Sequence, residues 1–76
     1  MKGSVVKGEE VIFERVRVSL AEEPRQMIWG GFVYLPRAEM EKGEYELRLE
    51  DGRSGTIRVV SVKDWIARFH GSGPLA

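Results

Sequence analysis

The residues best suited to chemistry lie in the stretch 49–55, which reads LEDGRSG. Asp51 supplies a carboxylate, Arg53 a guanidinium and Ser54 a hydroxyl. At the tip of a rigid hairpin, a guanidinium and a hydroxyl would suit an anionic or polar partner. The same residues also suit a plain turn, in which Asp51 accepts hydrogen bonds from turn amides and the other two side chains face solvent. The sequence leaves both interpretations open.

The sequence offers little for metal binding or catalysis. His70 is the single histidine and the chain has no cysteine, so a metal site would need mostly carboxylates, at no spacing that indicates one. Ser54 or Ser61 with His70 and Asp64 could form a catalytic set only without the usual G-x-S-x-G motif. We therefore predict a non-enzymatic protein with no metal and no cofactor.

Arginine makes up eight of the twelve basic residues, which suits phosphate contacts and stacking on bases. Twelve acidic residues bring the net charge to zero and are interleaved with the arginines, so any basic patch must be local. The rings available for stacking are Trp29, Phe32, Tyr34, Trp65 and Phe69. A small core would also use such rings.

The segment 27–35, MIWGGFVYL, is apolar on both faces of a strand. Such a strand is either covered on both sides or presents one side to a partner. Ile28, Phe32 and Tyr34 therefore form a candidate interface for a protein partner or a second copy of the chain. In the alternative, a bulge or corner at its glycine pair and a helical turn over 36–42 bury this surface.

The opening segment, residues 5–20, changes the parity of its apolar residues midway. A one-residue slip moves every side chain to the opposite face, so the change predicts one long, bent strand with a bulge near Glu14 and Arg15.

Two alternating segments flank the LEDGRSG stretch and predict a hairpin. A two-residue Asp-Gly turn would place Leu47 opposite Thr56, an apolar residue against a polar one. A three-residue connection places Leu47 opposite Ile57 and Glu46 opposite Arg58, which satisfies both faces. We therefore predict the longer connection.

The segment 64–70 fits either a strand or a short helix. As a strand it turns Trp65, Ala67 and Phe69 inward, and we favour this interpretation because so short a helix is marginal. Residues 71–76 are predicted to be a loop or a frayed terminus.

Residues 1–76 are thus predicted to form one all-β domain, a small five-stranded barrel with at most one short helical turn. The general strand layout resembles SH3-like or OB-like barrels, and this resemblance implies an architecture that serves peptide, nucleic-acid and scaffold roles alike. The sequence shows neither a secretory signal nor an apolar run long enough to span a bilayer. We expect a cytoplasmic protein with no membrane partner.

In function, we expect a binding or interaction module for a protein partner or for self-association. The alternative is a local patch of arginine and aromatic residues that binds single-stranded nucleic acid or another anionic ligand. The predicted binding residues are Asp51, Arg53, Ser54, Tyr34, Arg58, Arg68 and His70.

Overall fold

The computed structural model describes residues 1–37 and 39–76. Within these residues the chain forms six strands and no helix, which confirms the all-β prediction. The strands are β1 (Lys2–Lys7), β2 (Glu10–Glu23), β3 (Ile28–Tyr34), β4 (Gly43–Leu49), β5 (Ser54–Lys63) and β6 (Ile66–Ser72).

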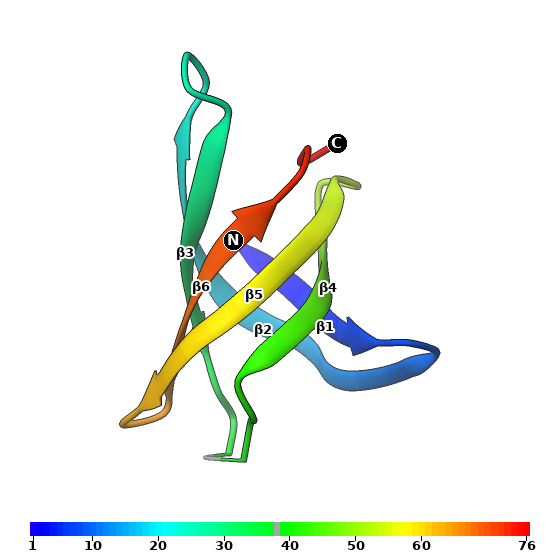
Figure 1. Cartoon of the computed structure of the whole chain (residues 1–76). Helices are drawn as coiled ribbons and strands as arrows, with labels where there is room; N and C mark the ends of the chain where they lie inside the picture. Colours follow the sequence, from blue (N-terminus) through cyan, green and yellow to red (C-terminus); the bar gives the residue numbers. More distant parts are fainter. Residues whose placement is uncertain (38) are drawn as a thin grey trace.

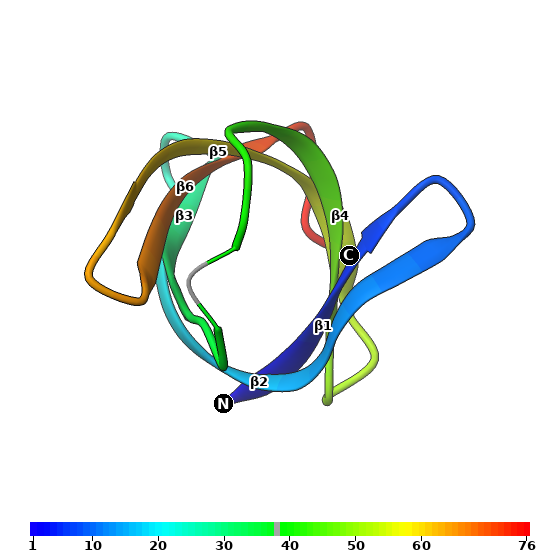
Figure 2. The ribbon, with the colours of Figure 1, turned by 90° about the horizontal axis from the view of Figure 1, so that it is seen from below.

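The strands close into an antiparallel barrel in the order β1-β2-β3-β6-β5-β4, with β4 paired to β1 (Figures 1 and 2). Strands β1 to β3 follow one another as hairpins and β4 returns to lie beside β1, which makes a Greek key. The β5–β6 hairpin completes the ring. The predicted small barrel is therefore confirmed, and closure leaves no strand with an unpaired edge among the described residues.

The barrel has six strands and not the predicted five because the segment 5–20 contains a reversal. The chain turns at Gly8, which adopts φ 62°, and Glu9, so that β1 and the start of β2 form a hairpin. The bulge predicted near Glu14 and Arg15 is confirmed, since the register between β1 and β2 shifts there and Arg15 adopts φ 54°. The SH3-like or OB-like subtype stays a prediction.

Inward-facing apolar side chains from all six strands fill the barrel. The strand interpretation of the last segment is confirmed by β6, but Trp65 does not face inward as predicted. Trp65 lies in the β5–β6 turn with φ 68° and is 55% exposed. The buried core residues are Val5, Phe13, Val16, Val18, Trp29, Val33, Leu35, Tyr45, Leu47, Leu49, Ile57, Val59, Ala67 and Phe69.

The connection from β3 to β4 runs across one mouth of the barrel (Figure 2). Leu35 at its start is buried and Met40 packs against the core, so this segment covers that end. The helical turn predicted over 36–42 is not formed by the described residues of the segment; Ala38 lies outside them.

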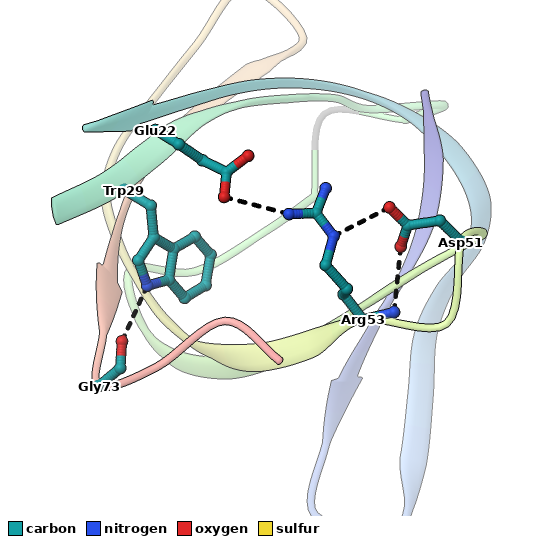
Figure 3. Close-up of polar contacts among 5 residues, drawn as sticks. All are labelled: Glu22, Trp29, Asp51, Arg53 and Gly73. Atoms are coloured by element: carbon teal, nitrogen blue, oxygen red, sulfur yellow. Dashed lines mark hydrogen bonds and ion pairs between the residues drawn. The ribbon is translucent and has the colours of Figure 1, made fainter. Parts of the chain in front are cut away.

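The indole of Trp29 occupies a slot left by two glycines, Gly55 at the start of β5 and Gly71 in β6. A Cβ on Gly71 would overlap the ring, and a Cβ on Gly55 would lie 2.7 Å from Cζ2 of Trp29. The indole Nε1 donates a hydrogen bond of 2.9 Å to the carbonyl of Gly73 (Figure 3). The ring also meets Phe69 edge to face. The position of the Trp29 ring is thus fixed by the two glycines, by the hydrogen bond to Gly73 and by the contact with Phe69.

Residues 73–76 lie outside any strand, in agreement with the loop predicted over 71–76, but their end is hydrogen-bonded to the rest of the fold and is not frayed. Strand β6 continues to Ser72, and Ser54 and Ala76 then exchange two backbone hydrogen bonds of 2.9 and 3.0 Å. Leu75 packs against the core. The segment is ordered because it covers Trp29 and pairs with the start of β5.

We expect Gly71→Ala to lower the free energy of unfolding by roughly 1 to 3 kcal/mol, because the added methyl group must displace the Trp29 indole from its slot. Urea denaturation followed by tryptophan fluorescence would measure the loss. The control is Ser72→Ala at the exposed neighbouring position, which should stay within about 0.5 kcal/mol of the wild type. Wild-type stability of Gly71→Ala would contradict this packing.

Candidate functional site

The β4–β5 hairpin has the predicted three-residue connection, but it begins one residue earlier than predicted. Leu49 and Arg53 flank the loop, and the amide of Gly52, which adopts φ 95°, donates to the Leu49 carbonyl. Leu47 consequently pairs with Gly55 and not with Ile57. The register differs from the prediction by two residues, so inward and outward faces are unchanged.

Arg53 is held within the molecule by two carboxylates. Its Nε donates to Oδ2 of Asp51 at 2.9 Å, and its Nη1 donates to Oε1 of Glu22 on β2 at 3.1 Å (Figure 3). The backbone N–H of Arg53 also donates to Oδ1 of Asp51 at 3.0 Å. We call this group, Glu22, Asp51 and Arg53, the Arg53 bridge.

The Arg53 bridge shifts the ionisation of both of its hairpin members. Hydrogen bonds from the Arg53 backbone and then from its side chain lower the pKa of Asp51. Hydrogen bonds to Asp51 and Glu22 raise the pKa of the Arg53 guanidinium. The guanidinium therefore has two anionic partners already, and Ser54 is joined by its backbone to Ala76. The hairpin tip links parts of the fold and does not extend a free cation toward solvent.

The other predicted binding residues lie on a different part of the barrel. Tyr34, Arg58, Arg68 and His70 project outward from β3, β5 and β6. These strands are neighbours in the barrel, with β6 between β3 and β5 (Figure 1). The structure therefore separates the predicted set into a hairpin tip and an outer face. With the neighbouring outward residues of β2, β5 and β6, this basic face consists of Arg17, Phe32, Tyr34, Arg58, Lys63, Ile66, Arg68 and His70.

Strand pairing arranges the basic face in rows across the barrel. Arg17 lies across from Tyr34, and its guanidinium sits 5.3 Å from the centre of the Tyr34 ring. Arg68 lies across from Phe32 in the next row. His70 pairs with Arg58 in the third row, beside the side-chain-free Gly30. Arginines therefore alternate with aromatic rings over neighbouring strands.

Among the described residues, the strand pairings place no acid between the members of the basic face, and the acids nearest to it lie at its borders. Glu44 on β4 pairs with Arg58, with 3.6 Å between its Oε1 and Nη1, in place of the predicted neighbour Glu46. Glu23 and Asp64 lie at the ends of β2 and β5. In the described part of the chain, Arg17, Lys63 and Arg68 form no ion pair.

Aromatic residues of the chain divide between core and surface. Trp29 and Phe69, considered as stacking rings from the sequence, are core residues. Phe32 is 41% exposed and Tyr34 is 37% exposed, so their outer surfaces are available to a ligand. Ile28, the third residue of the predicted interface, is 58% exposed on the same strand.

Three members of the basic face were not identified from the sequence, the cations Arg17 and Lys63 and the apolar Ile66. Alternation along β2 and β5 indicates that Arg17 and Lys63 face outward, but the two strands are far apart in the sequence, so nothing in it places these residues on one face.

The described residues contain no group of three or more histidine, cysteine, aspartate or glutamate side chains placed to hold a metal ion. They also include no helix able to cross a membrane.

Comparisons of the chain with protein-family models, with curated proteins and with solved structures find no match. The function is therefore inferred from the arrangement of side chains on the barrel.

The Arg53 bridge predicts a pH-dependent effect of Asp51→Asn. The folded-state pKa of Asp51 is lowered from its ordinary 3.8, so the carboxylate stabilises the fold above that pH, and this stabilisation is lost as the pH falls through the lowered value. We expect Asp51→Asn to melt below the wild type at neutral pH and to converge with it in acid. Thermal unfolding measures both.

The control for Asp51→Asn is Glu9→Gln, which removes a carboxylate in the exposed β1–β2 turn. This variant should melt close to the wild type at both pH values. Equal melting temperatures of Asp51→Asn and the wild type at neutral pH would show that the bridge contributes nothing.

Proposed function

We propose that this protein is a non-enzymatic binding module whose basic face binds single-stranded nucleic acid. The observation that supports it most directly is local charge: Arg17, Lys63 and Arg68 share one face without acidic partners in the described residues, although the whole chain has a net charge of zero. Phosphates are attracted by such a concentration of cations.

The kind of cation supports the same ligand. Three of the face's cations are the arginines Arg17, Arg58 and Arg68, whose planar guanidinium groups contact phosphates through two hydrogen bonds and stack on bases. Exposed rings accompany them at Phe32 and Tyr34. The objection from interleaved acids applies to Arg48 and to the Arg53 bridge, which are paired with carboxylates. On the basic face it applies to Arg58, which pairs with Glu44 at the border, and not to Arg17, Lys63 or Arg68 among the described residues.

A second candidate is binding of a protein partner or a second copy of the chain. Its support is apolar exposure at the end of β3, where Met27 is 81% and Ile28 is 58% exposed. Sedimentation of the protein with and without Ile28→Thr separates this function from the first. A dimer that dissociates on this substitution would favour self-association, and a monomer at the concentrations used for binding would count against it.

The proposal predicts salt-dependent binding that requires the face's cations. We expect Lys63→Gln/Arg68→Gln to bind a mixed single-stranded oligonucleotide at least tenfold more weakly than the wild type at low salt. If each side chain neutralises one phosphate, the slope of log affinity against log salt should also fall by about 1.4. Fluorescence anisotropy at several salt concentrations measures both quantities.

The control is Lys2→Gln/Arg48→Gln, which makes the same change in net charge on β1 and β4, away from the basic face. It should bind like the wild type. Equal losses in the two double variants would show that binding is unspecific, and no binding by the wild type at low salt would remove the proposal.

A further inference from the structure

The two exposed rings of the basic face stand at a defined spacing along one strand. Phe32 and Tyr34 both project outward from β3 with one inward residue between them. A strand rises about 3.3 Å per residue, so their Cα atoms are about 6.6 Å apart. Because β3 pairs without a register shift to β2 and to β6, neighbouring strands fix this spacing on both sides.

That spacing is wider than the separation of bases in a duplex, where successive bases of one strand rise about 3.4 Å. Bases inside a duplex also keep their flat surfaces against one another and have none to offer a side chain. A single strand can spread its bases and lay each one on an aromatic ring. Two rings side by side on a sheet therefore favour an extended single strand of nucleic acid whose bases are not stacked on one another.

Each ring has its own arginine. Arg17 reaches Tyr34 from β2, and Arg68 lies across from Phe32 on β6. Residues directly across antiparallel strands have Cβ atoms about 5 Å apart, close enough for one nucleotide to contact both members of a pair. Each ring of β3 thus has one neighbouring arginine, from β2 at Tyr34 and from β6 at Phe32, as each nucleotide has one base and one phosphate.

We infer that two consecutive nucleotides of a single strand bind along β3, with one base stacked on Phe32 and the next on Tyr34, and with their phosphates at Arg68 and Arg17. This inference rests on the proposed function and makes it more specific. The ligand is a single strand with unstacked bases, and the rings contact the flat surfaces of these bases, which every base possesses. Binding is therefore tolerant of base sequence.

The first experiment compares three polyanions by competition against a labelled oligothymidine of about ten nucleotides. The competitors are the unlabelled oligothymidine, a DNA duplex of the same length, and inorganic polyphosphate at the same concentration of phosphate. We expect the single strand to compete at least tenfold better than either of the others. Equal competition by all three would overturn the inference and leave a site for anionic polymers in general.

The second experiment removes the rings and keeps apolar bulk and charge. Phe32→Leu and Tyr34→Leu should each weaken binding of the oligothymidine roughly 5- to 100-fold, the effect of losing one stacked base. Neither substitution removes a cation, so the dependence of affinity on salt should be unchanged. The control is Val11→Ala, at a half-exposed residue of β2 outside the basic face.

The outcomes distinguish the proposed function from the stacking arrangement. If Lys63→Gln/Arg68→Gln loses binding but Phe32→Leu and Tyr34→Leu do not, the proposed function stands and the stacking arrangement is wrong. If the wild type binds no oligonucleotide at low salt, both are wrong. Thermal unfolding of each variant, expected to match that of the wild type closely, ensures that any loss reflects binding and not misfolding.

Discussion

The antiparallel pairing of β3 with β6 closes the barrel, and the adjacent Gly30 and Gly31 let β3 lie close to β6 on one side and to β2 on the other. A Cβ on Gly30 would lie 2.7 Å from the carbonyl oxygen of Phe69, and a Cβ on Gly31 would overlap the Ser19 carbonyl of β2. Without this pairing β3 and β6 would each be an edge strand with unpaired backbone groups. The same pairing places Arg68 beside Phe32, so barrel closure and the basic face have one origin.

The pairing explains how a neutral chain acquires a charged face. Charged residues are divided unevenly among the strands: β2 and β4 carry both acids and bases, whereas β1, β3, β5 and β6 contain no acid. Strand order then sets which of them become neighbours: the acids of β4 lie next to Arg58 and Arg48, whereas β2, β3 and β6 meet mostly through cations and rings. Charge pattern on a barrel is therefore a property of its topology and cannot be obtained from net charge.

Local patterns in the sequence predicted much of this fold. Alternation gave the inward residues of β4 to β6, and the parity change located the bulge near Arg15. The same pattern could not distinguish Leu47 opposite Ile57 from Leu47 opposite Gly55, because a shift of two residues keeps both faces intact. In the observed register Leu47 pairs with Gly55, which leaves room for the Trp29 indole of β3, and this contact between β3 and β5 is long-range in sequence.

Contacts between residues far apart in the sequence also explain the wrong predictions for β3 and for the hairpin tip. The glycine pair of β3 was predicted to make a bulge or corner, but the strand is regular and the glycines serve close approach instead. Arg53 was predicted as a binding residue because nothing nearby in sequence reveals Glu22, its partner from β2. Arg17 and Lys63 were missed because sequence order does not indicate that β3 lies beside β6, the pairing that brings the β2–β3 and β5–β6 hairpins together.

Hairpin tip and basic face consequently have different roles. At the tip, Arg53 joins β2 to the β4–β5 loop through two carboxylates, which uses its hydrogen-bonding capacity inside the molecule. On the basic face, Arg17 is oriented by the Tyr34 ring and has no carboxylate partner within the described residues. A ligand there meets side chains already spaced by paired strands, so less conformational freedom is lost on binding than at a flexible loop. Arg53, the charged residue most conspicuous in the sequence, is thus engaged by carboxylates of the fold, whereas Arg17, Lys63 and Arg68 on the sheet have no carboxylate partner among the described residues.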